Sequence, residues 1–144
     1  MGKVLKIQLN IKKGEAPVPV ESCEAVEGSG IRGDRHVGRG ERDVCLCRKE
    51  LLDWMGEQDV QGLCFARHKE NLLLEGFGDG ELIPGRQLAG AEAVLEISDF
   101  PKHCFPEECG LAKAGIFCKL REEYQMARIL RSGVIRTGEE MTLL

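Results

Sequence analysis

Aromatic residues are scarce in this chain of 144 residues: Phe, Trp and Tyr together make up 5% of it. Proteins that bind single-stranded nucleic acid stack bases on aromatic side chains, and such a platform is hard to build here. Positive charge is not in excess either, since the net charge is -4 and the chain has no long run of Lys and Arg. Both features argue against a nucleic-acid partner, although a local basic patch can still bind a small anion.

Long apolar segments are also missing. No apolar run reaches the ~20 residues that a membrane-spanning helix needs. Residues 1–6 lack the apolar stretch of a secretory signal. We therefore expect a cytoplasmic protein with no membrane partner. The seven cysteines are an odd number in such a chain, so reduced thiols fit better than a full disulfide framework.

The size and the residue pattern predict one mostly β domain. A length of 144 residues suits a single domain, residues 1–144, with one core. Short apolar strands are punctuated by Gly and Pro, and residues 47–56 have the apolar spacing of a helix that stops at Gly56. The expected fold class is a mostly β barrel or sandwich with one or a few short peripheral helices.

The strand predictions depend mainly on alternation. Residues 4–11 alternate apolar and polar side chains, as a half-buried strand does. Residues 111–121 are ambiguous, and residues 124–130 fit either a helix or a strand. Further strands are predicted within residues 20–26, 43–47, 63–76, 87–90, 91–98 and 134–141.

The stretch from Ser98 to Cys109 is the first candidate for chemistry. Cys104 directly follows Lys102 and His103 between two prolines, which disfavour helix and central strand, so we expect a rigid loop after a strand. A nearby Lys or protonated His favours the thiolate, the form of cysteine that acts as nucleophile, metal ligand or sulfur carrier. The alternative is that Cys104 is a small buried apolar residue, the commoner role of a lone cysteine.

A glycine-rich, basic segment spans residues 28–40. Three of its glycines fit G-x-G-x-x-G, but no helical period follows them, so we reject a dinucleotide-binding unit. We expect a loop that holds an anion through guanidinium groups and backbone N–H groups. The alternative for each single residue is an ordinary solvated charge. The candidate anion ligands in and after this segment are Arg32, Arg35, His36, Arg39 and Arg42.

Two smaller groups of residues are further candidates for a metal or functional site. Cys45 and Cys47 lie two apart in a predicted strand and so share a face. They resemble half of a metal site, but no partner pair is near in the sequence, and core packing is favoured. His68, Glu70 and Asn71 lie beside an apolar run. Hydrogen bonding in a turn or at the surface is their ordinary alternative to a functional role.

Several motifs in this order resemble the MOSC family, which is named for the C-terminal domain of molybdenum cofactor sulfurases. Residues 33–38, which contain Asp34, are similar to the family's G-D-x-H-x-G segment. Residues 42–47 are similar to its R-Q-V-S-L-L strand, and residues 70–72 are similar to its E-N signature. The resemblance covers nearly the whole chain, residues 3–141.

The positions of three cysteines also match the family. Cys104 falls where the family places its motif cysteine. Cys109 and Cys118 match the cysteine-rich last third of the small stand-alone bacterial members. The resemblance implies a compact MOSC-type β-barrel, closed or partly open, that handles the molybdenum (or tungsten) pterin cofactor or sulfur destined for it. It also implies that the family motifs, with Asp34, Glu70 and Asn71, help the basic loop to bind this anionic cofactor.

Three hypotheses follow for the role of the cysteine loop. In the first, Cys104 carries sulfur as a persulfide, Lys102 and His103 favour its thiolate, and a sulfur donor protein or a molybdoenzyme is the partner. In the second, the protein is a non-catalytic carrier of the cofactor, and Cys104 coordinates molybdenum. In the third, Cys104, Cys109 and Cys118 hold a structural zinc ion with His103, although paired C-x₂-C knuckles are missing.

Overall fold

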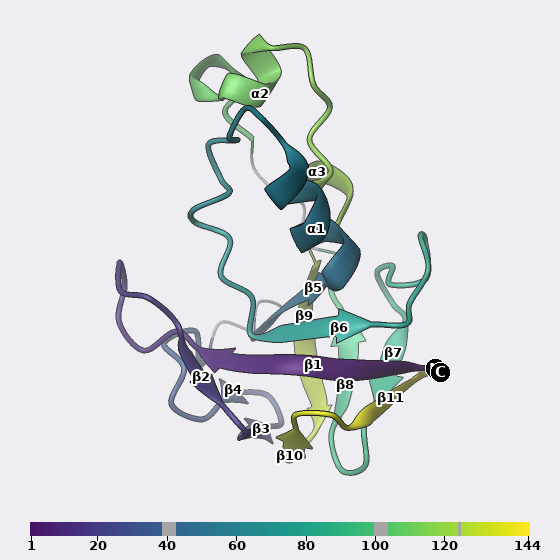
Figure 1. Cartoon of the computed structure of the whole chain (residues 1–144). Coiled ribbons are helices and arrows are strands. Elements are labelled where there is room, and N and C mark those ends of the chain that lie inside the picture. Colours follow the sequence, from purple (N-terminus) through teal and green to yellow (C-terminus); the bar gives the residue numbers. More distant parts are fainter. Residues whose placement is uncertain (39–42, 100–103, 124) are drawn as a thin grey trace.

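The computed structural model describes residues 1–38, 43–99, 104–123 and 125–144. Seven of the described strands close into a barrel, because the last strand returns to pair with the first (Figure 1). The prediction of a mostly β fold with a closed barrel and short helices is confirmed. In their order around the barrel the strands are β11 (Glu140–Leu143), β7 (Gln87–Ala89), β8 (Val94–Ile97), β9 (Gln125–Arg131), β5 (Val44–Arg48), β6 (Leu72–Glu75) and β1 (Gly2–Leu9).

A smaller sheet packs on the barrel. Its strands are β10 (Gly133–Arg136), β3 (Ser22–Val26) and β4 (Gly30–Ile31), in that order, while β2 (Val18–Val20) pairs with β1 outside the closed ring. Cys23 and Ile135 are partners across the small sheet, and both are buried. They belong to the same apolar cluster as the barrel interior, so this sheet covers one side of the barrel core.

The helices lie together at one end of the molecule (Figure 1). α1 (Lys49–Glu57) connects the parallel strands β5 and β6. The long connection from β8 to β9 carries the 3₁₀ helix η2 (Pro106–Glu108) and the short helices α2 (Gly110–Lys113) and α3 (Leu120–Glu123). None of the helices in the described residues has the length and apolar character needed to cross a membrane.

Strand β5 separates two apolar cores. All of its residues are buried, which is unusual for a strand that alternates its side chains between two faces. Val44 and Leu46 belong to the barrel core. Cys47 belongs to a second core with Leu51 of α1 and Leu111 of α2. The outer face of β5 is therefore covered by the helical end, and Cys45 and Cys47 are both buried.

The structure also corrects and completes the predicted elements. Gly56 does not stop α1: it lies inside the helix, which ends at Glu57. The reason is that the Gln58 amide donates to Met55 O (3.4 Å) and its side chain donates to Trp54 O (3.0 Å), so no left-handed glycine is needed. The ambiguous residues 111–121 fall in α2, α3 and the turn between them, and residues 125–131 form a strand.

Candidate functional site

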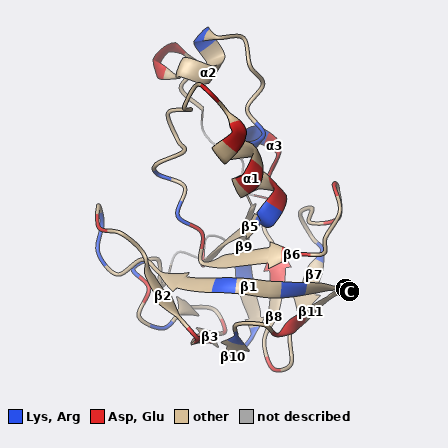
Figure 2. Cartoon of the chain, in the orientation of Figure 1, with Lys and Arg blue, Asp and Glu red and all other residues tan. Residues whose placement is uncertain are grey.

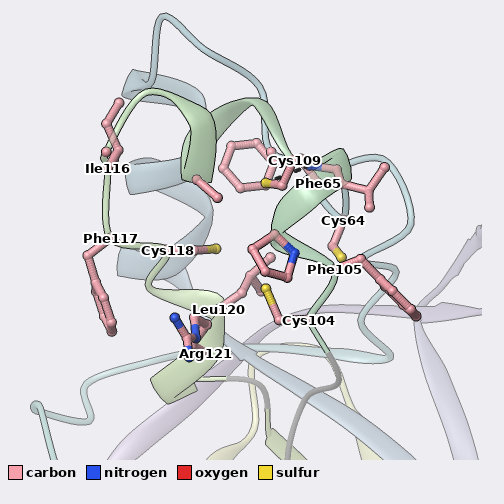
Figure 3. Close-up of a pocket in the computed structure, with 15 residues that line it drawn as sticks. Cys64, Phe65, Cys104, Phe105, Cys109, Ile116, Phe117, Cys118, Leu120 and Arg121 are labelled. Atoms are coloured by element: carbon pink, nitrogen blue, oxygen red, sulfur yellow. Dashed lines mark hydrogen bonds between the residues drawn. The ribbon is translucent and has the colours of Figure 1, made fainter.

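A pocket of about 340 Å³ lies between residues 62–65 and the excursion that carries α2 and α3. Cysteines are its distinguishing feature, and Figure 3 shows the sulfur atoms of Cys104 and Cys118 turned toward its centre. The other walls are mainly apolar, and Arg121 is the one charged side chain among the described lining residues. Its four cysteines are Cys64, Cys104, Cys109 and Cys118.

A glycine-capped helix shapes one wall of this pocket. α2 begins directly after Cys109, and Gly115 adopts a left-handed backbone (φ 74°) just past the helix end. The Gly115 amide donates to Ala112 O (3.1 Å), and the Ile116 amide donates to Leu111 O (2.9 Å). These two bonds are the pair that defines a Schellman cap. The cap reverses the chain, so residues on both sides of the turn line the pocket.

Cys104 lines the pocket and is half-buried, so it is neither fully exposed nor sealed in the core. This position agrees with a thiol that a small reagent can reach. Lys102 and His103, the predicted neighbours that would favour the thiolate, lie outside the described residues. Their role therefore stays a prediction.

Cys109 has surroundings that favour a thiolate. The backbone N–H of Leu63 donates to its sulfur (3.4 Å) from the opposite wall of the pocket. This hydrogen bond, with a second from the Ala112 amide, lowers the pKa of Cys109 below its ordinary value. Burial instead raises the pKa of Cys118, and the neighbouring Cys109 and Cys104 add to that rise. Two thiols of one pocket thus differ in the direction of their pKa shifts.

Sequence reasoning did not single out Cys64, which comes from the other wall. It lies far from the remaining pocket cysteines along the chain, and no local motif marks it. Only the closing of the fold brings it to them. The one signal in the sequence is the high cysteine count itself.

Arg121 supplies positive charge to the pocket. Its guanidinium carbon lies 5.9 Å from the ring centroid of Phe117, a cation–π distance. Elsewhere the charges are mixed: Figure 2 shows acidic and basic residues interspersed along the chain rather than gathered by sign. A thiol-lined pocket with one cation suits a small, partly apolar anion.

The family-like motifs meet at a different place, under the glycine-rich segment. Asp34 is 2% exposed, and its carboxylate accepts hydrogen bonds from the Asn10 amide (2.7 Å), the His36 amide (3.0 Å) and Asn71 Nδ2 (3.0 Å). The His36 ring nitrogen Nδ1 also lies 2.8 Å from Asp34 Oδ2. The carboxylate therefore ties the segment to the barrel.

Asn71 extends this network into the barrel. Its Oδ1 accepts from the Cys45 amide (3.0 Å), and its Nδ2 also donates to Gln8 O (3.1 Å). Asn71 is 1% exposed, so its amide has no surface left for a ligand. Of the predicted cofactor-binding residues, the structure brings Asp34, His36 and Asn71 together, and it uses their polar atoms to hold the chain in place.

The basic residues of the segment face outward. Arg32 and Arg35 are exposed, and Arg32 pairs with Glu24 (3.3 Å). Arg39 and Arg42, the other predicted arginines, lie outside the described residues. No described residue that lines the cysteine pocket belongs to residues 28–38. In the described part of the segment, residues 28–38, the structure thus brings no residue into one pocket with Cys104.

Glu70 lies with two other potential ligands instead. One atom each of Cys47, His68 and Glu70 lies within 4.8 Å of the others. Burial raises the pKa of both Cys47 and Glu70. Among the described residues, no other group of three or more His, Cys, Asp or Glu side chains lies this close together. Cys104, Cys109 and Cys118 in particular do not form such a group. His103 is outside the described residues, so the zinc hypothesis for the loop stays a prediction.

Comparisons with known proteins find solved structures that share this fold. No family model matches the chain, and no curated protein matches it. Its structure is similar to that of YuaD from Bacillus subtilis, with 18% identity, a TM-score of 0.73, and coverage of 99% of this chain and 96% of that one.

Two proteins called YiiM are also similar. For YiiM from Geobacillus stearothermophilus the identity is 18%, the TM-score is 0.67, and 100% of this chain and 75% of that one are covered. For YiiM from Escherichia coli the values are 15%, 0.61, 99% and 69%. At these identities the likeness shows a shared fold over the whole of this chain and nothing further.

Proposed function

We propose that this chain is a MOSC-type protein that handles sulfur for the molybdenum (or tungsten) pterin cofactor, with Cys104 as the sulfur-bearing thiol. Two observations support the family: the order and spacing of the motifs, and the fold shared with YuaD and YiiM. The reduced thiols that the proposal needs fit a cytoplasmic setting.

The observation that carries the role is the place of Cys104. It is half-buried on the wall of a pocket that three further cysteines line. A thiolate there can attack the outer sulfur of a donor persulfide. A new S–S bond then forms on Cys104, the S–S bond of the donor breaks, and the donor leaves as a thiolate. The apolar walls limit the access of water to the sulfur so held.

The pocket also fits the chemistry of the proposed acceptor. Thiol sulfur is a soft donor of the kind that sulfur-loving metals prefer. Arg121 lines the pocket and would pair with the cofactor's anionic group, and a volume of about 340 Å³ is at the small end of ligand pockets. Bound there, the cofactor would supply the metal centre that accepts sulfur. The exposed Arg32 and Arg35 would then serve a partner, either a sulfur donor protein or a molybdoenzyme.

Mass spectrometry after incubation with a persulfide donor tests the proposal. We expect one added sulfur atom on Cys104, and none at this position in Cys104→Ser. Cys118→Ser is the matched control from the same pocket and should still gain the sulfur. A Cys104 that gains no sulfur in the reduced wild-type protein would refute the role.

A non-catalytic carrier is the second candidate, because Cys104 is equally placed to be a metal ligand. The protein made in a cofactor-producing host separates the two by metal analysis and X-ray absorption. Molybdenum or tungsten with one added protein thiolate, lost in Cys104→Ser, would support the carrier. An empty site in a protein that accepts sulfur would support transfer.

A further inference from the structure

We propose that Cys47, His68 and Glu70 form a binding site for one divalent transition-metal ion, with zinc as the preferred ion. One ligand atom from each residue lies within 4.8 Å of the other two. One thiolate, one imidazole and one carboxylate are a donor set that zinc accepts, and three protein ligands leave a fourth position for water or another ligand. This site is separate from the cysteine pocket, and it does not depend on the function proposed above.

The ligands come from a rigid part of the fold. Cys47 is in β5, and His68 and Glu70 precede β6, the strand that pairs with β5 in parallel. The register Cys47↔Leu73 fixes the two strands relative to each other. The His68 amide donates to Cys64 O (3.0 Å), which fixes the turn that carries the imidazole. Strand pairing thus holds Cys47, and His68 and Glu70 lie on the connection just before β6.

Burial and charge favour a cation at this place. Cys47 is 0% exposed and Glu70 is 5% exposed. A carboxylate buried this deeply is normally paired with a cation or bound to a metal. No ion pair between described residues includes Glu70. Lys6 attracts its carboxylate only at longer range. A metal ion between the three ligands would place a positive charge in direct contact with this carboxylate.

The donor types select the metal. A thiolate ligand disfavours calcium and magnesium, which prefer oxygen donors. Thiolate and imidazole are instead common ligands of zinc. Cys45 lies on the same face of β5 as Cys47 but does not belong to the three-ligand group.

The site would also brace the cysteine pocket. The turn that holds His68 carries Cys64 and Phe65, and both of these line the pocket. The same segment supplies the Leu63 amide that donates to the Cys109 sulfur. Metal bound to His68 would therefore hold this wall in position.

A cobalt titration of the full chain tests the proposal. The protein is reduced, stripped with a chelator, and titrated with Co²⁺, whose absorption spectrum reports thiolate ligation and coordination number. We expect one Co²⁺ per chain, a thiolate-to-cobalt charge-transfer band, a four-coordinate ligand-field spectrum, and displacement by Zn²⁺. His68→Asn, at a half-buried position, should weaken binding by more than about 100-fold, because loss of supporting residues alone costs that much.

Matched variants make the result decisive. Glu70→Gln keeps the size of the side chain and should also weaken Co²⁺ binding, while the double variant Cys104→Ser, Cys118→Ser should bind as the wild type does. Circular dichroism confirms that each variant is folded. The proposal is overturned if the wild type binds no Co²⁺, if His68→Asn binds it unchanged, or if the pocket double variant loses the charge-transfer band.

Discussion

The polar network around Asp34 and the cysteine pocket differ in almost every physical property. The network is buried and rich in hydrogen bonds, and its atoms serve one another. The pocket is open, apolar and rich in sulfur, and Arg121 is the one cation among its described lining residues. A polar motif can therefore resemble a ligand site in sequence, although in the structure its hydrogen bonds hold two segments of the chain together. Four predictions test this division.

The largest effect is expected for Asp34→Ala. The change leaves the Asn10 amide, the His36 amide and Asn71 Nδ2 without their buried acceptor. Removing one partner of a buried charged network costs about 3–5 kcal/mol of unfolding free energy. Urea denaturation measures it. The control is Asp53→Ala, which breaks an exposed pair with Lys49 and should cost less than about 0.5 kcal/mol. Equal losses in the two variants would contradict a structural role for Asp34.

Arg48→Met should come next. The buried guanidinium donates to Glu123 (2.8 Å), to Asp79 (2.6 Å) and to Phe77 O (2.9 Å). It thereby fastens α3, part of the pocket wall, to the barrel. We expect a loss of about 2–4 kcal/mol, since Glu123 would keep its charge without a partner. Thermal or urea unfolding measures it, and Arg48→Lys should fall between the variant and the wild type. Unchanged stability in Arg48→Met would show that α3 is held by apolar packing alone.

The third prediction concerns two thiols of one pocket. Hydrogen bonds lower the pKa of Cys109, whereas burial raises the pKa of Cys118. As pH falls, Cys109 should therefore keep its thiolate, and its reactivity, to lower pH than Cys118. Pulse alkylation with mass spectrometry gives a pH profile for each residue. Dividing each profile by its own maximum removes the effect of exposure. Coincident profiles would contradict the hydrogen-bond argument.

Arg121→Gln should have the smallest effect on stability, because its contact with Phe117 is worth about 0.5–1 kcal/mol. It removes the one charge among the described lining residues of the pocket, so binding of a small anion should weaken while folding stays intact. Calorimetric titration with molybdate measures the change. The control is Arg32→Gln, which lies outside the pocket. Equal weakening in both variants would place the anion elsewhere.

Much of the fold could be predicted because local patterns matched the local structure. The alternation over residues 4–11 predicts a strand, and β1 spans residues 2–9; the apolar spacing over residues 47–56 predicts a helix, and α1 spans residues 49–57. The shift of register between Val4 and Lys6 was not predictable, because it depends on the partner strand β6. β9 was ambiguous because most of its residues are buried, so its two faces do not differ enough in polarity.

The candidate site was harder to predict. Cys104, Cys109 and Cys118 were named from the sequence, and the fold gathers all three. Cys64 and the group formed by Cys47, His68 and Glu70 were missed, because their members meet only when distant segments pack. For Asp34 the motif was noticed, yet its fastening role was not. Its partner Asn71 lies on another element, and sequence alone does not show that the two touch.

The pairing of β11 with β1 has a consequence for how the chain is made. Gly2 and Met141 are register partners, so the ring cannot close until residue 141 has been synthesised. During translation one edge of β1 stays unpaired until β11 has been synthesised, and unpaired edges can pair with strands of other chains. Contacts this distant in sequence also slow folding. Deleting β11 should therefore harm the yield of folded protein far more than its small share of the core implies.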